Sequence, residues 1–293
     1  MTTDRIWDNS TIDLFLKCRK KYEYRHVMDL EAKTVSPALE FGKAIHLGLE
    51  AYYTHQRSLD EAVRAFATCY SDREGDELRT VENGVKLLTT YAEVYKHESL
   101  EILGLEQGFA VPVPHPDKPG HSIIYGGKLD GLVKWDGAVY VLEHKTTSAL
   151  NYSYFEQFRP NQQLDGYVYG ARALTGLPIA GVLVNALEPW KEVKRVTDKT
   201  KRPEDHFARA PIQRSEIELE DFARDVNEIV GEILKCEQDN RYYKTRSACR
   251  DFNYNCVYKD LCLYGPDERF IKANYNVKKW EPYVVGEKKE GEV

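Results

Sequence analysis

Residues 125–148 read YGGKLDGLVKWDGAVYVLEHKTTS, and this stretch decides the fold. Two apolar runs rich in strand-forming residues flank the dipeptide Asp136-Gly137. A two-residue type I′ turn needs positive φ at both central positions, and Asp-Gly is a strong short-range signal for it. The stretch therefore predicts a β-hairpin in which Trp135 pairs with Ala138.

This register places Asp130 directly opposite Glu143, with their Cβ atoms about 5 Å apart. Because strand side chains alternate between faces, Lys145 lies on the face of Glu143 and His144 on the other. Two like charges in this position are destabilising unless something neutralises them. Mg²⁺ and Mn²⁺ prefer oxygen ligands, and a neighbouring lysine can stabilise developing charge or help deprotonate an attacking water. A surface hairpin with scattered charges is the alternative.

Composition sets the broad class. The 293 residues are 42% hydrophobic, which is enough for one large or two ordinary globular domains. No apolar run approaches 18 residues and no charged-then-apolar leader begins the chain, so we expect no membrane partner and a cytoplasmic location. A net charge of −6 argues against coating of nucleic acid through bulk charge, although it allows a local basic groove.

The first hundred residues have helical patterns. Ser10 is expected to cap a basic, aromatic-rich helix through residues 11–26, and Ser36-Pro37 to open a second helix that contains His46. Ser58 starts a capping box for a third helix, and residues 76–98 predict a fourth. This region is therefore expected to be helical.

The pattern changes to strands after residue 100. A run at 103–111, the hairpin, a helix over 160–174 opened by Pro160 and a buried strand over 181–189 predict a mixed α/β (α+β) core. Residues 197–206 predict a flexible loop, and a long helix follows from Ser215 to about Cys236. The expected organisation is a helical region (1–100), a catalytic core (101–235), a cysteine-rich segment packed on the same domain (236–275) and a charged tail (276–293).

Three cysteines fall within fourteen residues near the C-terminus: Cys249, Cys256 and Cys262. Thiolates select iron–sulfur clusters or zinc, and both ordinarily need four ligands. Cys18 is the first choice for the fourth ligand, and Cys236 is its competitor. Cys69 lies in an amphipathic helix and is expected in the core. Three incidental cysteines in a tyrosine-rich segment are the alternative.

Four motifs occur in a characteristic order: FGKAIH at 41–46, GGKLDG at 126–131, LEHK at 142–145 and QLDGY at 163–167. In this order the chain resembles the PD-(D/E)XK nuclease superfamily over about residues 10–265. The RecB-like and AddB-like exonucleases are the most similar branch, together with four-cysteine iron–sulfur nucleases of CRISPR adaptation and phage genomes. The resemblance implies a central mixed sheet of the restriction-endonuclease-like type, flanked by helices.

The resemblance also implies roles for individual residues. The catalytic residues would be Asp130, Glu143 and Lys145, and the metal ligands would be His46, Asp130, Glu143, the main-chain carbonyl of His144 and, less closely matched, Glu106. Gln163 and Tyr167 would place DNA. Arg19, Lys20 and Lys21 form a basic run that is either a phosphate contact or a solvated face. A 4Fe-4S cluster would be bound by Cys18, Cys249, Cys256 and Cys262.

The cysteine spacing departs from the family pattern, because six residues separate Cys249 from Cys256 where many members have two. The five-residue gap to Cys262 does match. Zn²⁺ at the same four cysteines therefore stays open as an alternative to the cluster.

The expected function is a Mg²⁺- or Mn²⁺-dependent exonuclease that acts on DNA ends or single strands in recombination, repair or phage replication. A non-catalytic DNA-binding or assembly subunit that retains the fold is the rival. The chain has no GxxxxGK[ST] loop, so unwinding would need a separate helicase or recombination partner.

Overall fold

The computed structural model describes residues 2–191, 200–251 and 254–282. The backbone forms two compact units. The first comprises Met1–Val35, Gly108–Gly127 and Glu216–Val293, and the second comprises Ser36–Gln107 and Lys128–Ser215. Each unit is thus assembled from segments that are distant in the sequence.

The strands form a six-stranded mixed sheet in the order β1-β4-β5-β6-β7, with β3 paired to β4. Strand β1 is parallel to β4 and β5 is parallel to β6, whereas the β4–β5 and β6–β7 pairs are antiparallel. The predicted fold class is therefore confirmed. The strands are β1 (Thr2–Trp7), β3 (Glu101–Pro114), β4 (Ser122–Trp135), β5 (Ala138–Thr146), β6 (Ile179–Leu187) and β7 (Phe207–Gln213).

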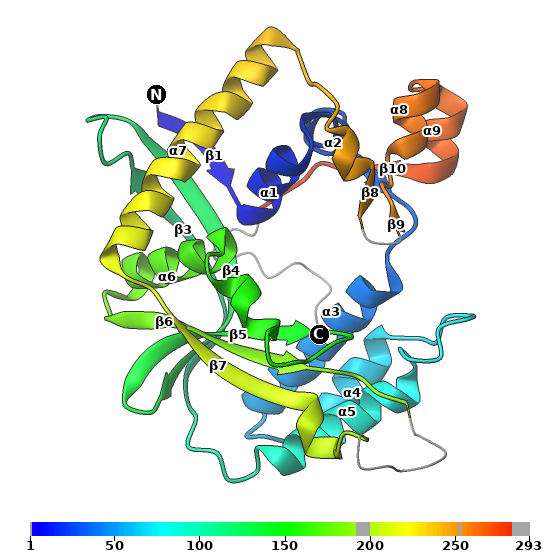
Figure 1. Cartoon of the computed structure of the whole chain (residues 1–293), viewed down its shortest axis with the longest axis vertical. Coiled ribbons are helices and arrows are strands. Elements are labelled where there is room, and N and C mark those ends of the chain that lie inside the picture. The colour runs from blue at the N-terminus through cyan, green and yellow to red at the C-terminus, as the bar shows by residue number, and fades with distance from the viewer. Residues whose placement is uncertain (1, 192–199, 252–253, 283–293) are drawn as a thin grey trace. The chain divides into compact units, whose positions relative to one another are not determined.

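In the second unit, helices pack on the apolar faces of β5 and β6 (Figure 1). Helix α3 packs closely on α4, and its Phe41 contacts the ring of Phe66 edge-on at 5.8 Å. The predicted Ser58 cap is confirmed, because its hydroxyl accepts from the main-chain N–H of Glu61. The helices are α3 (Pro37–Thr54), α4 (Leu59–Cys69), α5 (Val81–Val94) and α6 (Gln162–Thr175), with 3₁₀ turns at Tyr154–Phe158 and Pro203–His206.

The first unit contains the chain's ends within the described range. Helix α1 packs on the long helix α7, and strand β2 pairs antiparallel with β10. Its elements are α1 (Asn9–Lys17), α2 (Arg19–Tyr22), a π-helix (Glu23–Val27), β2 (Leu30–Ala32), α7 (Glu216–Asp239), a 3₁₀ turn (Arg246–Cys249), β8 (Arg250–Asp251), β9 (Tyr254–Asn255), α8 (Lys259–Tyr264), α9 (Glu268–Asn274) and β10 (Tyr275–Val277).

Several predicted boundaries were wrong. The first helix is capped by Asp8, whose carboxylate accepts from the N–H of Thr11 at 2.7 Å, and not by Ser10. The helix stops at Cys18, where the backbone is extended. Helix α5 begins after Thr80 and not at residue 76, and α6 is capped by Asn161 and not opened by Pro160.

The sequence also hid two strands of the six-stranded sheet. Strand β1 precedes α1 in the region expected to be helical, and its sequence TTDRIW has too few apolar residues to show alternation. Strand β7 follows the predicted loop, part of which (197–199) lies outside the described residues. Pro211 within β7 argued against a strand, yet β7 ends the sheet order, where a missing N–H can be tolerated.

Cys69 was expected in the core and is instead exposed. It is the last residue of α4, whose buried side chains are Ala62 and Phe66, and the following Tyr70 is the next buried one. Among the helices of the described part of the chain, none is both long and apolar enough to cross a membrane.

Candidate active site

The hairpin register is the one that the sequence predicts. Trp135 pairs with Ala138, and the pairing continues to Gly131 with Leu142. Both turn residues have positive φ, 46° at Asp136 and 79° at Gly137, as a type I′ turn requires. The regular pairing ends one position before the two carboxylates.

Asp130 is therefore held by contacts other than the hairpin ladder. Its Oδ2 accepts the main-chain N–H of His144 at 2.8 Å and lies 3.2 Å from Nδ1 of His46 on α3. Burial opposes ionisation of Asp130, but the imidazole and the main-chain donor outweigh it and lower the pKa of the carboxyl. Asp130 is thus an anion fixed between a helix and β5.

The pKa of Glu143 is shifted in the opposite direction to that of Asp130. Burial is the main cause that raises the pKa of Glu143, and the negative charge of Asp130 adds to it. Its Oε1 accepts from Lys145 Nζ at 2.5 Å, whereas the buried Oε2 has no hydrogen-bond partner. An unpaired buried carboxylate oxygen is costly, so it marks a position where a further positive or donating group would fit.

Helix α6 holds the lysine from the other side. Lys145 Nζ donates to Oε1 of Gln163 at 3.1 Å, and Gln163 Nε2 donates to the hydroxyl of Tyr167 at 2.9 Å. The two residues are one helical turn apart, so they share a face of α6. The structure therefore connects Gln163 and Tyr167 directly to Lys145.

Glu106, on β3, lies near Asp130. Its backbone has a φ of 50°, which is strained for a residue with a side chain, and its carboxylate pairs with Lys128. Burial raises the pKa of Glu106 to about 7, and the nearby carboxylates of Glu50 and Asp130 contribute. Glu50 was not predicted, although it is one turn from His46 on the same face of α3.

The donor set suits a hard divalent cation, because carboxylate oxygens, an imidazole and a main-chain carbonyl are ligands that Mg²⁺ or Mn²⁺ accepts. Within the described ranges, no three His, Cys, Asp or Glu side chains are already arranged around a metal position. The geometry explains this, since His46 faces Asp130 and Lys145 faces Glu143. The unpaired Oε2 of Glu143 is the observation that favours the fit.

In the first unit, the four predicted cysteines lie near one another. The Cys262 thiol interacts electrostatically with those of Cys18 and Cys249, and the Cys256 thiol with those of Cys249 and Cys262. Burial raises the pKa of both Cys256 and Cys262. Burial raises the pKa of Cys236, the competitor, and the charged groups Arg19 and Glu232 also act on it.

The basic run has mixed surroundings. Arg19 pairs with Glu232 at 3.0 Å and is stacked on the ring of Tyr243, and Lys20 pairs with Glu23. Lys21 acts electrostatically on the Cys256 thiol.

Sequence reasoning missed two polar residues that connect to His144, namely Asn185 on β6 and Arg209 on β7. Asn185 is fully buried in the otherwise apolar run of β6, and its Nδ2 lies 2.7 Å from His144 Nδ1. A polar residue inside a strand that is apolar on both faces was the available signal.

Comparison with known proteins supplies a family. The model of the PD-(D/E)XK nuclease superfamily matches residues 9–263. No curated protein matches the chain.

Two solved structures were compared with the chain. A candidate exonuclease from Eubacterium rectale is 12% identical, with a TM-score of 0.51 and coverage of 87% of this chain and 92% of that one. An alkaline exonuclease from Laribacter hongkongensis is 16% identical, with a TM-score of 0.27 and coverage of 69% of this chain and 97% of that one. At these identities, the first comparison supports the fold alone.

Proposed function

Because the chain belongs to the PD-(D/E)XK nuclease superfamily, we propose that it is a metal-dependent deoxyribonuclease, and specifically an exonuclease that hydrolyses phosphodiester bonds at DNA ends or in single strands. The family supports a hydrolase that acts on DNA. The description of the Eubacterium rectale protein as a candidate exonuclease supports the narrower activity.

One observation carries the proposal: an ionised Asp130 and a buried Glu143 with an unpaired oxygen lie beside the ammonium group of Lys145. A protein stabilised only by packing has no need for two carboxylates in this position, because burying them without a cation is unfavourable. The arrangement supports a site built for a charged ligand.

Mg²⁺ or Mn²⁺ would be held by His46, Asp130, Glu143 and the main-chain carbonyl of His144, with Glu106 as an outlying ligand. When bound, the cation neutralises the carboxylates, lowers the pKa of water and offsets charge on the phosphate. PD-(D/E)XK nucleases generally use such divalent metals.

Side chains and main-chain groups of the protein orient the carboxylate, the attacking water and the DNA. His46 and the N–H of His144 hold Asp130 ionised and oriented. Lys145 Nζ, held between Glu143 and Gln163, orients the attacking water as an ammonium or, in its neutral form, deprotonates it; as an ammonium it also faces the charge that develops on the phosphate oxygens. Gln163 and Tyr167 place DNA in this proposal, and the contact of Gln163 with Lys145 would couple that placement to the nucleophile.

The cysteine group supports a narrower placement in the RecB-like or AddB-like branch. We propose that Cys18, Cys249, Cys256 and Cys262 bind a 4Fe-4S cluster, with Zn²⁺ as the alternative, in a structural role. The thiols are neighbours and partly buried, which supports either centre, although no three of them surround a metal position in the described part of the chain, so binding would have to draw them together. Visible absorbance of anaerobically purified protein separates the two, because an iron–sulfur cluster is coloured and Zn²⁺ is not.

The proposed setting is recombination, repair or phage replication in a cytoplasm, with a separate helicase supplying unwound DNA. Lys21, near the cysteines, is the best-placed phosphate contact of the basic run, since Arg19 and Lys20 already pair with carboxylates. The expected residue ranges for the helical region, core, cysteine segment and tail are part of the same proposal.

The first experiment compares wild type with Asp130→Asn on end-labelled single- and double-stranded DNA, in Mg²⁺, Mn²⁺ or EDTA. We expect wild type to shorten labelled strands only with metal and the variant to lose at least about 10²-fold in rate. Asp60→Asn, which changes an exposed aspartate on α4, is the matched control and should keep full activity.

The product ladder gives polarity and strand preference. If wild type binds DNA without cutting it in any metal, the nuclease proposal fails and a non-catalytic DNA-binding subunit becomes the better description.

A further inference from the structure

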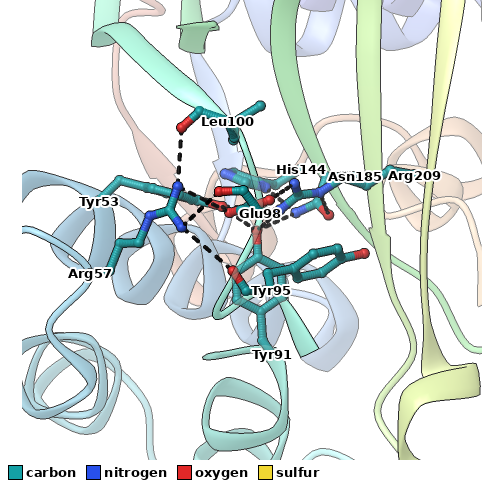
Figure 2. Close-up of polar contacts among 9 residues, drawn as sticks. All are labelled: Tyr53, Arg57, Tyr91, Tyr95, Glu98, Leu100, His144, Asn185 and Arg209. Atoms are coloured by element: carbon teal, nitrogen blue, oxygen red, sulfur yellow. Dashed lines mark hydrogen bonds and ion pairs between the residues drawn. The ribbon is translucent and has the colours of Figure 1, made fainter. Parts of the chain in front are cut away.

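A row of three polar residues crosses the sheet of the second unit. His144 on β5 is paired in register with Asn185 on β6, and Asn185 is paired with Arg209 on β7. Paired residues share a face, so all three side chains lie on the side that α3 and α5 cover. The Arg209 side chain is only 7% exposed, and Figure 2 shows the polar groups gathered around it.

Every nitrogen of the Arg209 guanidinium has a partner. It forms a buried ion pair with Glu98, and its Nη2 donates to the hydroxyls of Tyr91 at 2.6 Å and Tyr53 at 3.0 Å (Figure 2). The guanidinium also stacks 3.7 Å above the ring of Tyr95. Its position is therefore fixed from several directions.

This arginine fixes the orientation of the Asn185 amide. Arg209 Nε lies 2.8 Å from Asn185, and because a guanidinium only donates, the facing atom must be the carbonyl Oδ1. The Asn185 amino group then faces Nδ1 of His144 at 2.7 Å. Since the amino group only donates to it, this nitrogen must accept, and the ring proton of His144 is on Nε2.

The anchored ring belongs to the residue between Glu143 and Lys145. The main-chain N–H of His144 donates to Asp130, and its ring contacts the ring of His46 edge-on at 5.7 Å. The row thus ends at a residue whose main chain and side chain both contact the carboxylate site.

We propose that Arg209 and Asn185 are positioning residues of the nuclease site, which hold the His144 ring in one orientation and one tautomer and thereby hold the main chain of residues 143–145. The role rests on the proposed function. A buried ion pair adds little stability compared with apolar packing, but it specifies one arrangement of the groups around it. Here the specified arrangement reaches the strand that bears Glu143 and Lys145.

The decisive variant is Asn185→Asp, which keeps size and shape but removes the donor to His144 Nδ1. Metal-free protein with ¹⁵N-labelled histidine is compared by NMR, in which protonated and unprotonated ring nitrogens have distinct shifts. We expect Nδ1 of His144 to be unprotonated in wild type and protonated in the variant. Mn²⁺ affinity, measured by calorimetry, should fall about 10- to 100-fold.

Asn83→Asp is the matched control, because it makes the same change at another buried asparagine, whose Nδ2 donates to the carbonyls of Glu77 and Leu78. It should leave the His144 signals and the Mn²⁺ affinity unchanged. Arg209→Lys is the second variant if Asn185→Asp does not fold. It retains a charge for Glu98 but has no Nε to orient Asn185, so the His144 ring should populate both tautomers and Mn²⁺ affinity should again fall.

An unchanged His144 tautomer in both variants overturns the proposal. The proposal also fails if a variant has an altered His144 tautomer but binds Mn²⁺ as tightly as the Asn83→Asp control. Neither the NMR measurement nor the Mn²⁺ titration needs DNA cleavage. If wild type binds Mn²⁺ but cuts no DNA, the nuclease assignment fails. The His144 tautomer and the Mn²⁺ affinity then still decide the positioning role. Wild type that binds no Mn²⁺ overturns both.

Discussion

Replacement of Glu143 by glutamine should stabilise the metal-free protein while removing its response to metal. Glutamine keeps the shape and an oxygen for Lys145, and it replaces the oxygen without a partner, which lies in the field of the Asp130 carboxylate, by an NH₂ group that can donate. An unsatisfied buried group of this kind costs about 1–3 kcal/mol. At roughly 2–4 °C per kcal/mol for chains of similar size, the melting temperature in EDTA should rise by about 2–12 °C.

Metal should reverse the order of the two proteins. At a Mn²⁺ concentration 100-fold above Kd, binding stabilises wild type by about 2.7 kcal/mol, whereas Glu143→Gln should gain little. The assay is thermal unfolding followed by circular dichroism, with EDTA or with Mn²⁺. Wild type is then less stable than the variant in EDTA and at least as stable in Mn²⁺.

Glu188→Gln is the matched control, because Glu188 is also buried but has partners on both oxygens. Its Oε1 accepts from the N–H of Leu150 at 3.1 Å, and its Oε2 from Lys201 at 2.5 Å and His206 at 3.0 Å. The same substitution here should lower the melting temperature in both conditions. If Glu143→Gln also lowers it in EDTA, or if Mn²⁺ stabilises wild type and Glu143→Gln equally, the unpaired carboxylate is not a ligand site and the reasoning fails.

Three further changes test separate parts of the structure. Gln163→Leu removes both the 3.1 Å hydrogen bond to Lys145 and a proposed DNA contact, so it should lower kcat about tenfold and also raise the KM for DNA, measured in steady-state cleavage assays; a change confined to KM would contradict the role of the Lys145 contact. Burial, aided by two arginines, lowers the pKa of His26 to about 3 from an ordinary 6.5, so the unfolded state binds a proton that the folded state excludes between these values. The free energy of unfolding should therefore fall as pH decreases from 6.5 towards 3, and denaturant titrations should show a shallower fall for His26→Phe; parallel curves would refute the assignment. Gly181→Ala places a methyl group 2.2 Å from the main-chain oxygen of Ile212 and should lower the free energy of unfolding in urea by about 3 kcal/mol or more, whereas an unchanged midpoint would show that β7 can move.

The local part of the site was predictable from the sequence. The turn chemistry of Asp136-Gly137 fixes the register, and the register brings Asp130 near Glu143 with Lys145 on the same strand. The register alone does not predict where the regular pairing of the two hairpin strands ends. Asp130, one position beyond the last regular pair, accepts the N–H of His144 and contacts His46 on α3, a helix whose position the hairpin does not specify.

The distant part of the site was not predictable in the same way. Asn185 contacts His144, and Arg209 contacts Asn185, only because β5, β6 and β7 are neighbours. No local pattern specifies which strand adds to the edge of a sheet. Strand β7 also contains Pro211 and follows a polar stretch, so its own sequence argued against it. Gln163 was identified through its motif, but its contact with Lys145 needed the packing of α6 on β5.

The order of residues along the chain gives the row across β5, β6 and β7 a consequence for biosynthesis. Arg209 leaves the ribosome 65 residues after His144, a delay of several seconds at synthesis rates of about 5–20 residues per second. The hairpin can close as soon as its own residues emerge, but the imidazole of His144 remains unanchored until the last strand of the sheet is added. A truncated or nascent chain would thus carry the acidic pair without the ordered strand beside it, and cleavage of DNA would begin only after the sheet is complete.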